Sequence, residues 1–247
     1  MFNLADSFAN QYARACERKG GEAAIERVLG SSPSQETLRS LPDDRALALM
    51  AKRLFCAGFH WGVIEKKWPG FETVFHGFAP PALLALNAGQ VEAMAADARI
   101  VRNPTKVRAV IDNAHFVASV AAEHGSFGAM LAAHSPADLI GLWELLKKRG
   151  SRLGGNTGQY LLRGLGVDSF ILSRDVVTGL RELGLELADQ PTSKTQHKQI
   201  QACFNQLHRD TGRCYTHLSK ILAYANGENY PLETITTETQ KHERAPV

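Results

Sequence analysis

The sequence contains few cysteines, no long apolar run and little net charge. Its four cysteines, Cys16, Cys56, Cys203 and Cys214, form no CxxC pair and no short His/Cys spacing. This spacing argues against a disulfide framework or a structural zinc site, and it predicts reduced thiols in a cytosolic protein. No apolar run approaches the ~20 residues that span a bilayer. The first residues, MFNLADSFANQ, lack the basic and apolar blocks of a secretory signal.

The net charge of the 247-residue chain is only +3, and this total alone predicts no nucleic-acid partner. Binding to nucleic acid depends on clustered charge, and one segment of the chain is strongly clustered. Lys147, Lys148, Arg149 and Arg152 lie together in KKRGSRLGGNTG, beside a turn with three glycines. This segment is therefore the first candidate for a binding site.

Apolar residues recur at helical spacing along almost the whole sequence, and alternating strand patterns are absent. With 44% hydrophobic residues, the chain can form one large globular domain or two small ones that share a core. The spacing predicts an all-α protein. We expect two short helices within 2–29, a helix after Pro42, and further helices over 107–121, 135–149, 159–165, 173–183, 193–211 and 214–226.

Local signals mark several helix ends. Asp43 or Asp44 can cap the helix that they begin, since a carboxylate accepts hydrogen bonds from the first amides of a helix. Ser173 has the side chain of an N-cap, and Gly125 supplies a stop for the helix before it.

Two helices joined by the LGGNTG turn would form a helix-hairpin-helix. The glycines permit backbone conformations closed to other residues and let the chain approach another molecule closely. The helix after the turn directs its first amides outward, which suits an anion such as a phosphate, and the preceding cations add counter-charge. The alternative is an ordinary turn, in which the cations complement a helix C-terminus and the glycines cap it.

Three stretches carry a wider resemblance: AGFHWGVIEKKWPGFETVFHGFAP (57–80), ARIVRNPTKVRAVIDNA (98–114) and LLKKRGSRLGGNTGQYLLRGLGV (145–167). In order, spacing and residue type they resemble the helix-hairpin-helix DNA glycosylase superfamily and, within it, the 3-methyladenine DNA glycosylase I family. The resemblance implies an all-α fold in which a cleft separates two helical subdomains.

The resemblance also implies a domain organisation. A family-like core covers 43–185, and helical extensions at 1–42 and 190–230 pack on it, so that 1–230 form a single domain. The segment 231–247 is polar and without periodicity, and we expect it to be disordered.

Enzymes of this family turn a damaged nucleotide out of the duplex and hydrolyse its N-glycosidic bond. The resemblance therefore implies base excision repair on double-stranded DNA that contains damaged bases. It further implies a monomer in a bacterial-type cytoplasm, with no membrane partner and no cofactor except a monovalent cation that some relatives hold at the hairpin. The zinc-binding residues at the family's two ends are missing here, so we transfer no metal.

In the family the hairpin holds backbone phosphates, and such contacts read no base edges. Arg108 belongs to the same basic segment and could either contact phosphate or lie on a solvated surface. The residues at the family's DNA-binding positions are Gly58, Arg102, Lys106, Lys148, Arg152, Gly155, Asn156, Thr157 and Gly158.

The segment AGFHW resembles the family segment beside the extruded base and places Phe59 and Trp61 at the base pocket. Stacking on aromatic rings is worth about 1–3 kcal/mol per base, although both rings could instead belong to the core. Arg53 stands where the family has a glutamate, so the local charge is reversed. It points out of the pocket, pairs with a carboxylate or selects a different lesion.

The superfamily places a catalytic aspartate after the second helix of the hairpin, where this chain has Ser173. Serine cannot supply the negative charge that stabilises an oxocarbenium-like transition state, so we expect Asp175, two residues later, to be catalytic. Asp175 could instead pair with Arg174 or Arg53, or cap its helix, and Glu65 is the other nearby carboxylate. No lysine stands where bifunctional relatives carry one, which favours a monofunctional hydrolase.

Two other functions stay open. The missing glutamate and the displaced aspartate are compatible with a noncatalytic protein that binds damaged DNA on a glycosylase fold. A helical protein-interaction domain without a nucleic-acid role would leave the basic hairpin unused.

Overall fold

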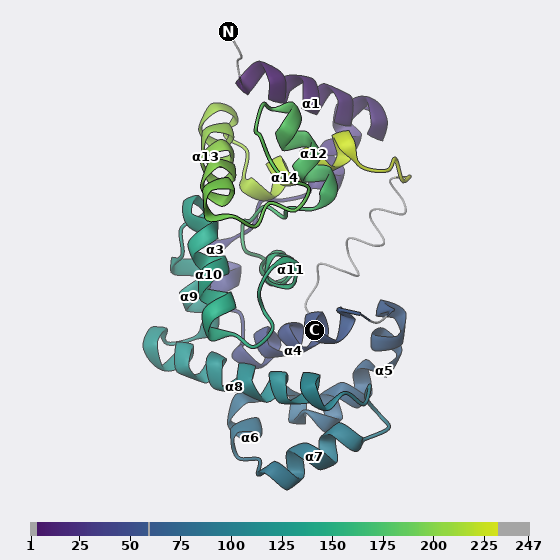
Figure 1. Cartoon of the computed structure of the whole chain (residues 1–247), viewed down its shortest axis with the longest axis vertical. Coiled ribbons are helices and arrows are strands. Elements are labelled where there is room, and N and C mark those ends of the chain that lie inside the picture. Colours follow the sequence, from purple (N-terminus) through teal and green to yellow (C-terminus); the bar gives the residue numbers. More distant parts are fainter. Residues whose placement is uncertain (1–3, 59, 232–247) are drawn as a thin grey trace. The chain divides into compact units, whose positions relative to one another are not determined.

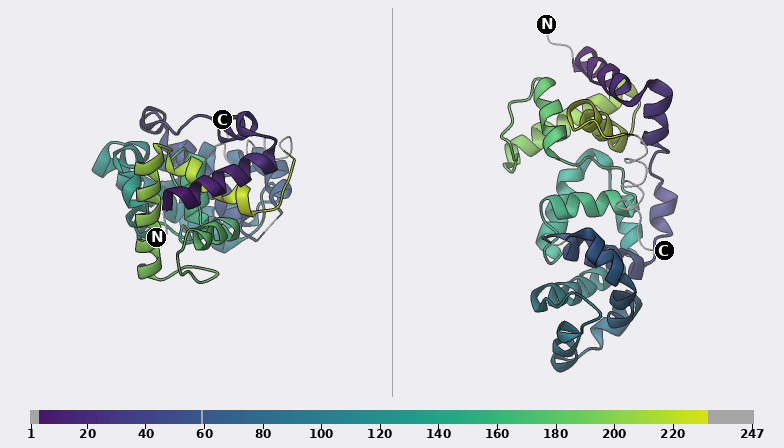
Figure 2. Two further views of the ribbon diagram at one scale, coloured as in Figure 1. Left: turned by 90° about the horizontal axis from the view of Figure 1, so that it is seen from above. Right: turned by 90° about the vertical axis from the view of Figure 1, so that its right-hand side faces the viewer.

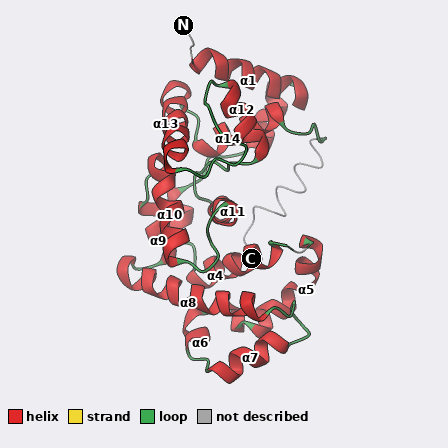
Figure 3. Ribbon diagram, in the orientation of Figure 1, coloured by secondary structure: helices red, strands yellow, loops and turns green. Residues whose placement is uncertain are grey.

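The computed structural model of the protein describes residues 4–58 and 60–231. Within these residues the chain forms 14 α-helices and two short 3-10 turns without any strand, which confirms the all-α prediction (Figure 1 and Figure 3). No helix in the described ranges is long and apolar enough to cross a membrane. The chain divides into two compact units, and each unit takes residues from separate stretches of the sequence.

The first unit, unit 1, takes its described residues from 4–34, 135–142 and 166–231. α14 packs beside both α1 and α12 (Figure 1 and Figure 2), so helices from the two ends of the described chain share one core. The rings of Phe170 and Phe204 stack in this unit with 4.2 Å between their centroids. Its elements are α1 (Leu4–Lys19), α2 (Glu22–Leu29), η2 (Pro136–Asp138), α12 (Arg174–Glu182), α13 (Lys194–Thr211) and α14 (Tyr215–Asn226).

The second unit, unit 2, takes its described residues from 35–134, without residue 59, and from 143–165. The helix α10 (Leu139–Arg149) begins in unit 1 and ends in unit 2. The other elements of unit 2 are α3 (Gln35–Arg39), α4 (Asp43–Cys56), α5 (Trp61–Val74), η1 (His76–Phe78), α6 (Pro80–Leu84), α7 (Ala88–Ala96), α8 (Pro104–His124), α9 (Phe127–Ala133) and α11 (Asn156–Leu165).

The core of unit 2 is built around α4, which packs against α5, α6, α8, α9 and α11. All residues of 46–51 are buried, together with Leu54 and Phe55, so the helix is apolar all round in its middle. The Phe55 ring meets the edge of Phe71 at 4.6 Å between centroids, and Trp68 stacks on Phe71 at 5.5 Å. Phe55, in the last turn of α4, ties this core to the end of the helix that leads into the AGFHW segment.

Several helix ends lie where the sequence predicts them. The Ser173 hydroxyl accepts a hydrogen bond from the Val176 amide at 3.3 Å, which makes Ser173 the N-cap of α12. Gly125 ends α8 with a φ of 90°. The four cysteines are free.

Two other ends differ from expectation. Neither Asp43 nor Asp44 caps α4, because Pro42 is its N-cap and makes no side-chain hydrogen bond. The Asp43 carboxylate instead accepts a hydrogen bond from the Phe127 amide, at the start of α9. The helix after the glycine turn begins at Asn156, earlier than the predicted residue 159. The predicted disordered segment lies outside the described residues apart from Pro231.

Candidate nucleic-acid interface

The hairpin consists of α10, a turn over 150–155 and α11. The Gly150 amide donates to the Leu146 carbonyl at 2.9 Å and so closes α10. Gly155 has a φ of 60°, in the left-handed region where glycine is favoured. A Cβ at Gly158 would lie under 3.0 Å from the Leu153 carbonyl oxygen, so α11 approaches the turn closely only because residue 158 has no side chain. The first turn of α11 consists of Asn156, Thr157 and Gly158. The amides of a first helical turn have no hydrogen-bond partner inside the helix.

The cations of the hairpin segment have two different environments. Lys147, Lys148 and Arg152 are exposed. Arg149 is instead paired with Glu123 on α8, through 2.9 Å and 2.5 Å hydrogen bonds to the two carboxylate oxygens. Arg149 thus ties α10 to α8, whereas Lys148 and Arg152 present the free counter-charge that phosphate binding needs.

A side chain of α8 holds the hairpin turn. Asn113 is fully buried. Its Nδ2 donates to the Ser151 carbonyl at 3.1 Å, and its Oδ1 accepts from the Ser151 amide at 2.8 Å. Both backbone groups of Ser151 are therefore fixed directly before Arg152, which itself has a φ of 60°.

The segment predicted to lie beside an extruded base connects α4 to α5. Gly58 is exposed and has a φ of 83°, while Phe59 lies outside the described residues. Trp61 is the first residue of α5 and is half-buried, with its ring stacked near His60 at 6.2 Å between centroids. Trp61 is less buried than Trp68 and Phe71 of the aromatic core.

Arg53 lies half-buried in the last turn of α4, and its Nε is buried. Burial raises the pKa of the nearby Cys56 thiol, and the positive charges of Arg53 and Lys52 act against that rise. Lys52 forms a 2.6 Å ion pair with Glu65. Glu65 is thus engaged by a lysine of the neighbouring helix, and the end of α4 carries net positive charge.

Lys106 requires a correction. We predicted a phosphate contact, but the residue is only 8% exposed. Its ammonium donates to the carbonyls of Ala57 at 2.5 Å and Phe55 at 3.3 Å. Burial, and next the charge of Arg152, lower the pKa of Lys106. The side chain satisfies carbonyls at the C-terminus of α4, so we remove it from the candidate DNA contacts.

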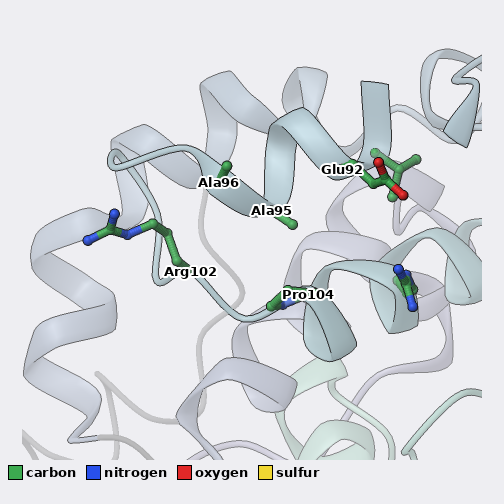
Figure 4. A pocket seen from close by; sticks show the side chains of 7 residues that line it. Glu92, Ala95, Ala96, Arg102 and Pro104 are labelled. Atoms are coloured by element: carbon green, nitrogen blue, oxygen red, sulfur yellow. The ribbon is translucent and has the colours of Figure 1, made fainter. Parts of the chain in front are cut away.

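Arg102 and Arg108 share a location in unit 2. Both are exposed and line a hollow of about 440 Å³ between α7 and the start of α8. Figure 4 shows Ala95 on α7, Pro104 at the start of α8 and Arg102 on the connection, its side chain extending away from both. Both arginines line the same hollow, and Arg102 stays a candidate contact. The hollow is lined by Val91, Glu92, Ala95, Ala96, Arg102, Pro104 and Arg108.

Asp175 lies in the first turn of α12, in unit 1, whereas Arg53 and Trp61 belong to unit 2. Its carboxylate faces the end of α14, where a Cβ at Gly227 would be 2.7 Å from Oδ2. A carboxylate at this position is favoured by the dipole of its helix.

Sequence reasoning missed the supporting residues on α8. Asn113 is a polar residue among the buried positions Val110, Ala114 and Val117, and such a residue signals a fixed hydrogen-bond partner. Its partner could not be named without the fold. Among the described residues there is no group of three or more His, Cys, Asp or Glu side chains that could hold a metal ion.

A glycine turn joins two helices of an all-α chain, and exposed cations lie at that turn, which is the arrangement expected from the resemblance to the helix-hairpin-helix DNA glycosylases. The family model described as Methyladenine glycosylase matches residues 40–160, which include the pocket segment, α8 and most of the hairpin. This match covers just under half of the chain.

Two known proteins are similar to parts of the chain. DNA-3-methyladenine glycosylase 1 of Escherichia coli (strain K12) is 36% identical over 58 residues, which are 24% of this chain and 31% of that protein. The match thus spans less than a third of the relative's length. A crystal structure of 3-methyladenine DNA glycosylase I is similar with a TM-score of 0.43 and 22% identity, covering 55% of this chain and 82% of that one.

Proposed function

We propose that the protein is a monofunctional DNA glycosylase that hydrolyses the N-glycosidic bond of an alkylated purine, such as 3-methyladenine, and leaves an abasic site. Its partner would be double-stranded DNA with a damaged base, turned out of the stack before hydrolysis. The whole relative that carries this activity is matched over a minority of its length, so the activity is a proposal for this chain.

One observation carries the proposal: unit 2 contains both a phosphate-type hairpin and a segment suited to a base. The first turn of α11, with exposed Lys148 and Arg152 beside it, offers amides and positive charge to a DNA backbone. The 57–61 segment offers an exposed glycine and the half-buried Trp61 ring. A flipped nucleotide needs both kinds of contact, because its phosphates are held while its base leaves the stack.

The chemistry requires little from the protein if the base is an N3-alkylated adenine. Water adds to C1′ of the deoxyribose and loses a proton to solvent, while the cationic base departs as a neutral molecule with the electrons of the N-glycosidic bond. Such a base is already a good leaving group, so stacking on Trp61 and correct orientation would supply much of the rate. Asp175 is the proposed carboxylate that stabilises positive charge on the sugar, and Arg53 would set lesion selectivity through its charge.

The test is a single-turnover assay on duplexes with 3-methyladenine, 7-methylguanine, hypoxanthine or uracil, in which alkali cleaves abasic sites. Trp61→Ala and Asp175→Asn should each slow release of the preferred base by at least about tenfold. Val63→Ala, an exposed change on the same helix as Trp61, is the matched control. A wild-type protein that releases none of the four bases would refute the proposed activity on them.

A second function, noncatalytic binding of damaged DNA, is favoured by one specific observation. By the resemblance, Ser173 stands at the aspartate position of the superfamily, and it serves as the helix cap of α12. A noncatalytic binding protein would bind lesion duplexes more tightly than lesion-free duplexes and release no base. The same assay, run beside a binding titration, separates the two functions.

We propose further that the protein acts as a monomer in the cytoplasm, with no organic cofactor and with a monovalent cation at the hairpin. Carbonyl oxygens of the 150–155 turn are hard donors that suit such a cation. The Ser151 carbonyl is already bonded to Asn113, so the cation would use other carbonyls of the turn. DNA affinity in potassium chloride and in tetramethylammonium chloride at equal ionic strength tests the cation, and sedimentation tests the monomer.

A further inference from the structure

The longest helix of unit 2, α8, contacts both halves of the proposed interface through two buried polar side chains. Lys106 bonds to the carbonyls that end α4, directly before Gly58. Asn113 bonds to both backbone groups of Ser151, directly before Arg152. They are seven positions apart in sequence, so they lie on one face of the helix, two turns and roughly 10 Å apart.

Each contact lies at a segment outside the helices. The 57–60 connection follows the C-terminus of α4, whose last carbonyls have no partner inside the helix. The Lys106 ammonium supplies that partner and also lies 5.7 Å from the centre of the Phe55 ring. Similarly, the 150–155 turn lies outside both α10 and α11, and the two Asn113 bonds give Ser151 the pairing that a helix would have supplied.

The charges of the hairpin turn and of the Lys106 ammonium also influence each other. The charge of Arg152 contributes to the lowered pKa of Lys106, so the cation of the hairpin turn lies near the anchor of the base-side segment. A rigid helix is a better support for such spacing than either loop alone.

We propose that Lys106 and Asn113 are positioning residues that fix the distance between the phosphate-binding turn and the base-side segment, Asn113 acting through Ser151 and Lys106 through Ala57. This inference rests on the proposed glycosylase function. It adds that one helix places both contacts of a nucleotide: Asn113 places the turn that binds its flanking phosphate, and Lys106 places the segment beside its extruded base. Neither residue touches the DNA.

The experiment compares Asn113→Leu and Lys106→Met, with His115→Ala as an exposed control on the same helix. Asn113→Leu should weaken binding to a lesion-free duplex about tenfold, because it removes two hydrogen bonds. Its release rate at saturating protein should stay within about threefold of wild type. Lys106→Met should show the converse: affinity within about threefold, and a release rate about 10- to 100-fold lower because the base is misplaced.

Backbone amide exchange in the free protein separates positioning from general destabilisation. Exchange should become faster over 150–155 in Asn113→Leu and over 55–60 in Lys106→Met, without a change in the core of α4. Asn113→Asp keeps the acceptor for the Ser151 amide and loses the donor, so its affinity should lie between those of wild type and Asn113→Leu. Asn113→Asp replaces Asn113→Leu in the affinity measurement if Asn113→Leu does not fold.

The outcomes are distinct from those that test the proposed function. Two variants that lose affinity and rate together, or lose neither, would overturn the positioning roles. If the wild type binds lesion duplexes but releases no base, the proposed function fails. The inference then stands only if Asn113→Leu still weakens all DNA binding and Lys106→Met abolishes the preference for the lesion.

Discussion

The Arg149 guanidinium donates to both carboxylate oxygens of Glu123, at 2.9 Å and 2.5 Å, and also donates to the Ser119 hydroxyl at 3.0 Å. It lies 5.5 Å from the centre of the Phe116 ring. Arg149 is therefore directed toward α8, although in sequence it is continuous with two exposed lysines.

This division predicts which cations of the hairpin bind DNA. Lys148→Gln and Arg152→Gln should each weaken binding and lower the slope of log affinity against log salt by about 0.9 for the phosphate contact that is lost. Arg149→Gln is the control, and its slope should equal that of wild type. Salt titrations by fluorescence anisotropy measure the slopes. Unchanged affinity in Lys148→Glu combined with Arg152→Glu would support the interaction-domain alternative.

Gly158 and Gly89 are both helical glycines, but the structure predicts opposite effects for their replacement by alanine. A Cβ at Gly158 would lie under 3.0 Å from the Leu153 carbonyl oxygen, so the turn must move, at a cost of about 1–3 kcal/mol. A Cβ at Gly89 would meet only Asn87 Oδ1, at 3.5 Å. Gly89→Ala should therefore stabilise the protein by about 0.4–1 kcal/mol. Urea unfolding of the two variants tests both signs.

Asp43 should stabilise a helix other than its own. Its Oδ1 lies 2.8 Å from the amide nitrogen of Phe127, the first residue of α9. Asp43→Ala should lower the free energy of unfolding by about 0.5–2 kcal/mol, as loss of a helix cap does. Asp43→Asn retains an oxygen acceptor and should keep most of that stability. Equal losses in the two variants would show that charge, rather than the hydrogen bond, is responsible.

His217 should make the protein less stable in mild acid. Its Nε2 is buried without a hydrogen-bond partner in the part of the chain that the structure describes. Burial, and then the charges of Lys220 and Arg213, lower the pKa of His217, while Glu26 and Asp168 oppose this shift. The unfolded chain, with an ordinary pKa of 6.5, binds a proton at higher pH than the folded chain does. Stability is therefore complete above this value and falls as the pH falls below it.

The dependence of unfolding free energy on pH between 7 and 5 measures this effect. His217→Gln should reduce the slope by up to about 1.4 kcal/mol per pH unit. His115→Gln, which removes an exposed ring, is the control. An identical slope in wild type and His217→Gln would contradict the prediction.

Helix ends were predictable where the signal is local. Ser173 caps α12 through an amide three residues ahead, and Gly125 ends α8 through its own backbone angle. Asp43 was assigned to the wrong helix because its partner, Phe127, lies 84 residues away. Asn156 to Gly158 resembled a turn because glycine usually marks one, whereas Gly158 is required inside a helix for close approach to Leu153.

The sequence predicts which segments form the site, but not which of their cations are exposed and which bond to protein oxygens. Lys148 and Arg152 are exposed as a DNA contact requires. Lys106 and Arg149 have the same side-chain types in the same basic stretches, yet they bond to protein oxygens. Their roles depend on where α4 ends and on where Glu123 lies, and neither is encoded near them in the sequence.

The packing of α1 against α14 has a consequence for the order in which the chain folds. The Arg14 side chain donates to Asn226 at 2.6 Å across 212 positions of sequence. All of the described residues of unit 2 have left the ribosome once residue 165 has emerged, whereas unit 1 lacks its central helix until residue 226. At a synthesis rate of 5–20 residues per second, roughly 10–40 s pass between the synthesis of α1 and that of α14. During this time α14 does not cover the apolar face of α1 around Phe8 and Ala15. Of the described helices, α1 is the first to be synthesised and among the last to reach its packed position, and during that interval the nascent chain is open to chaperones.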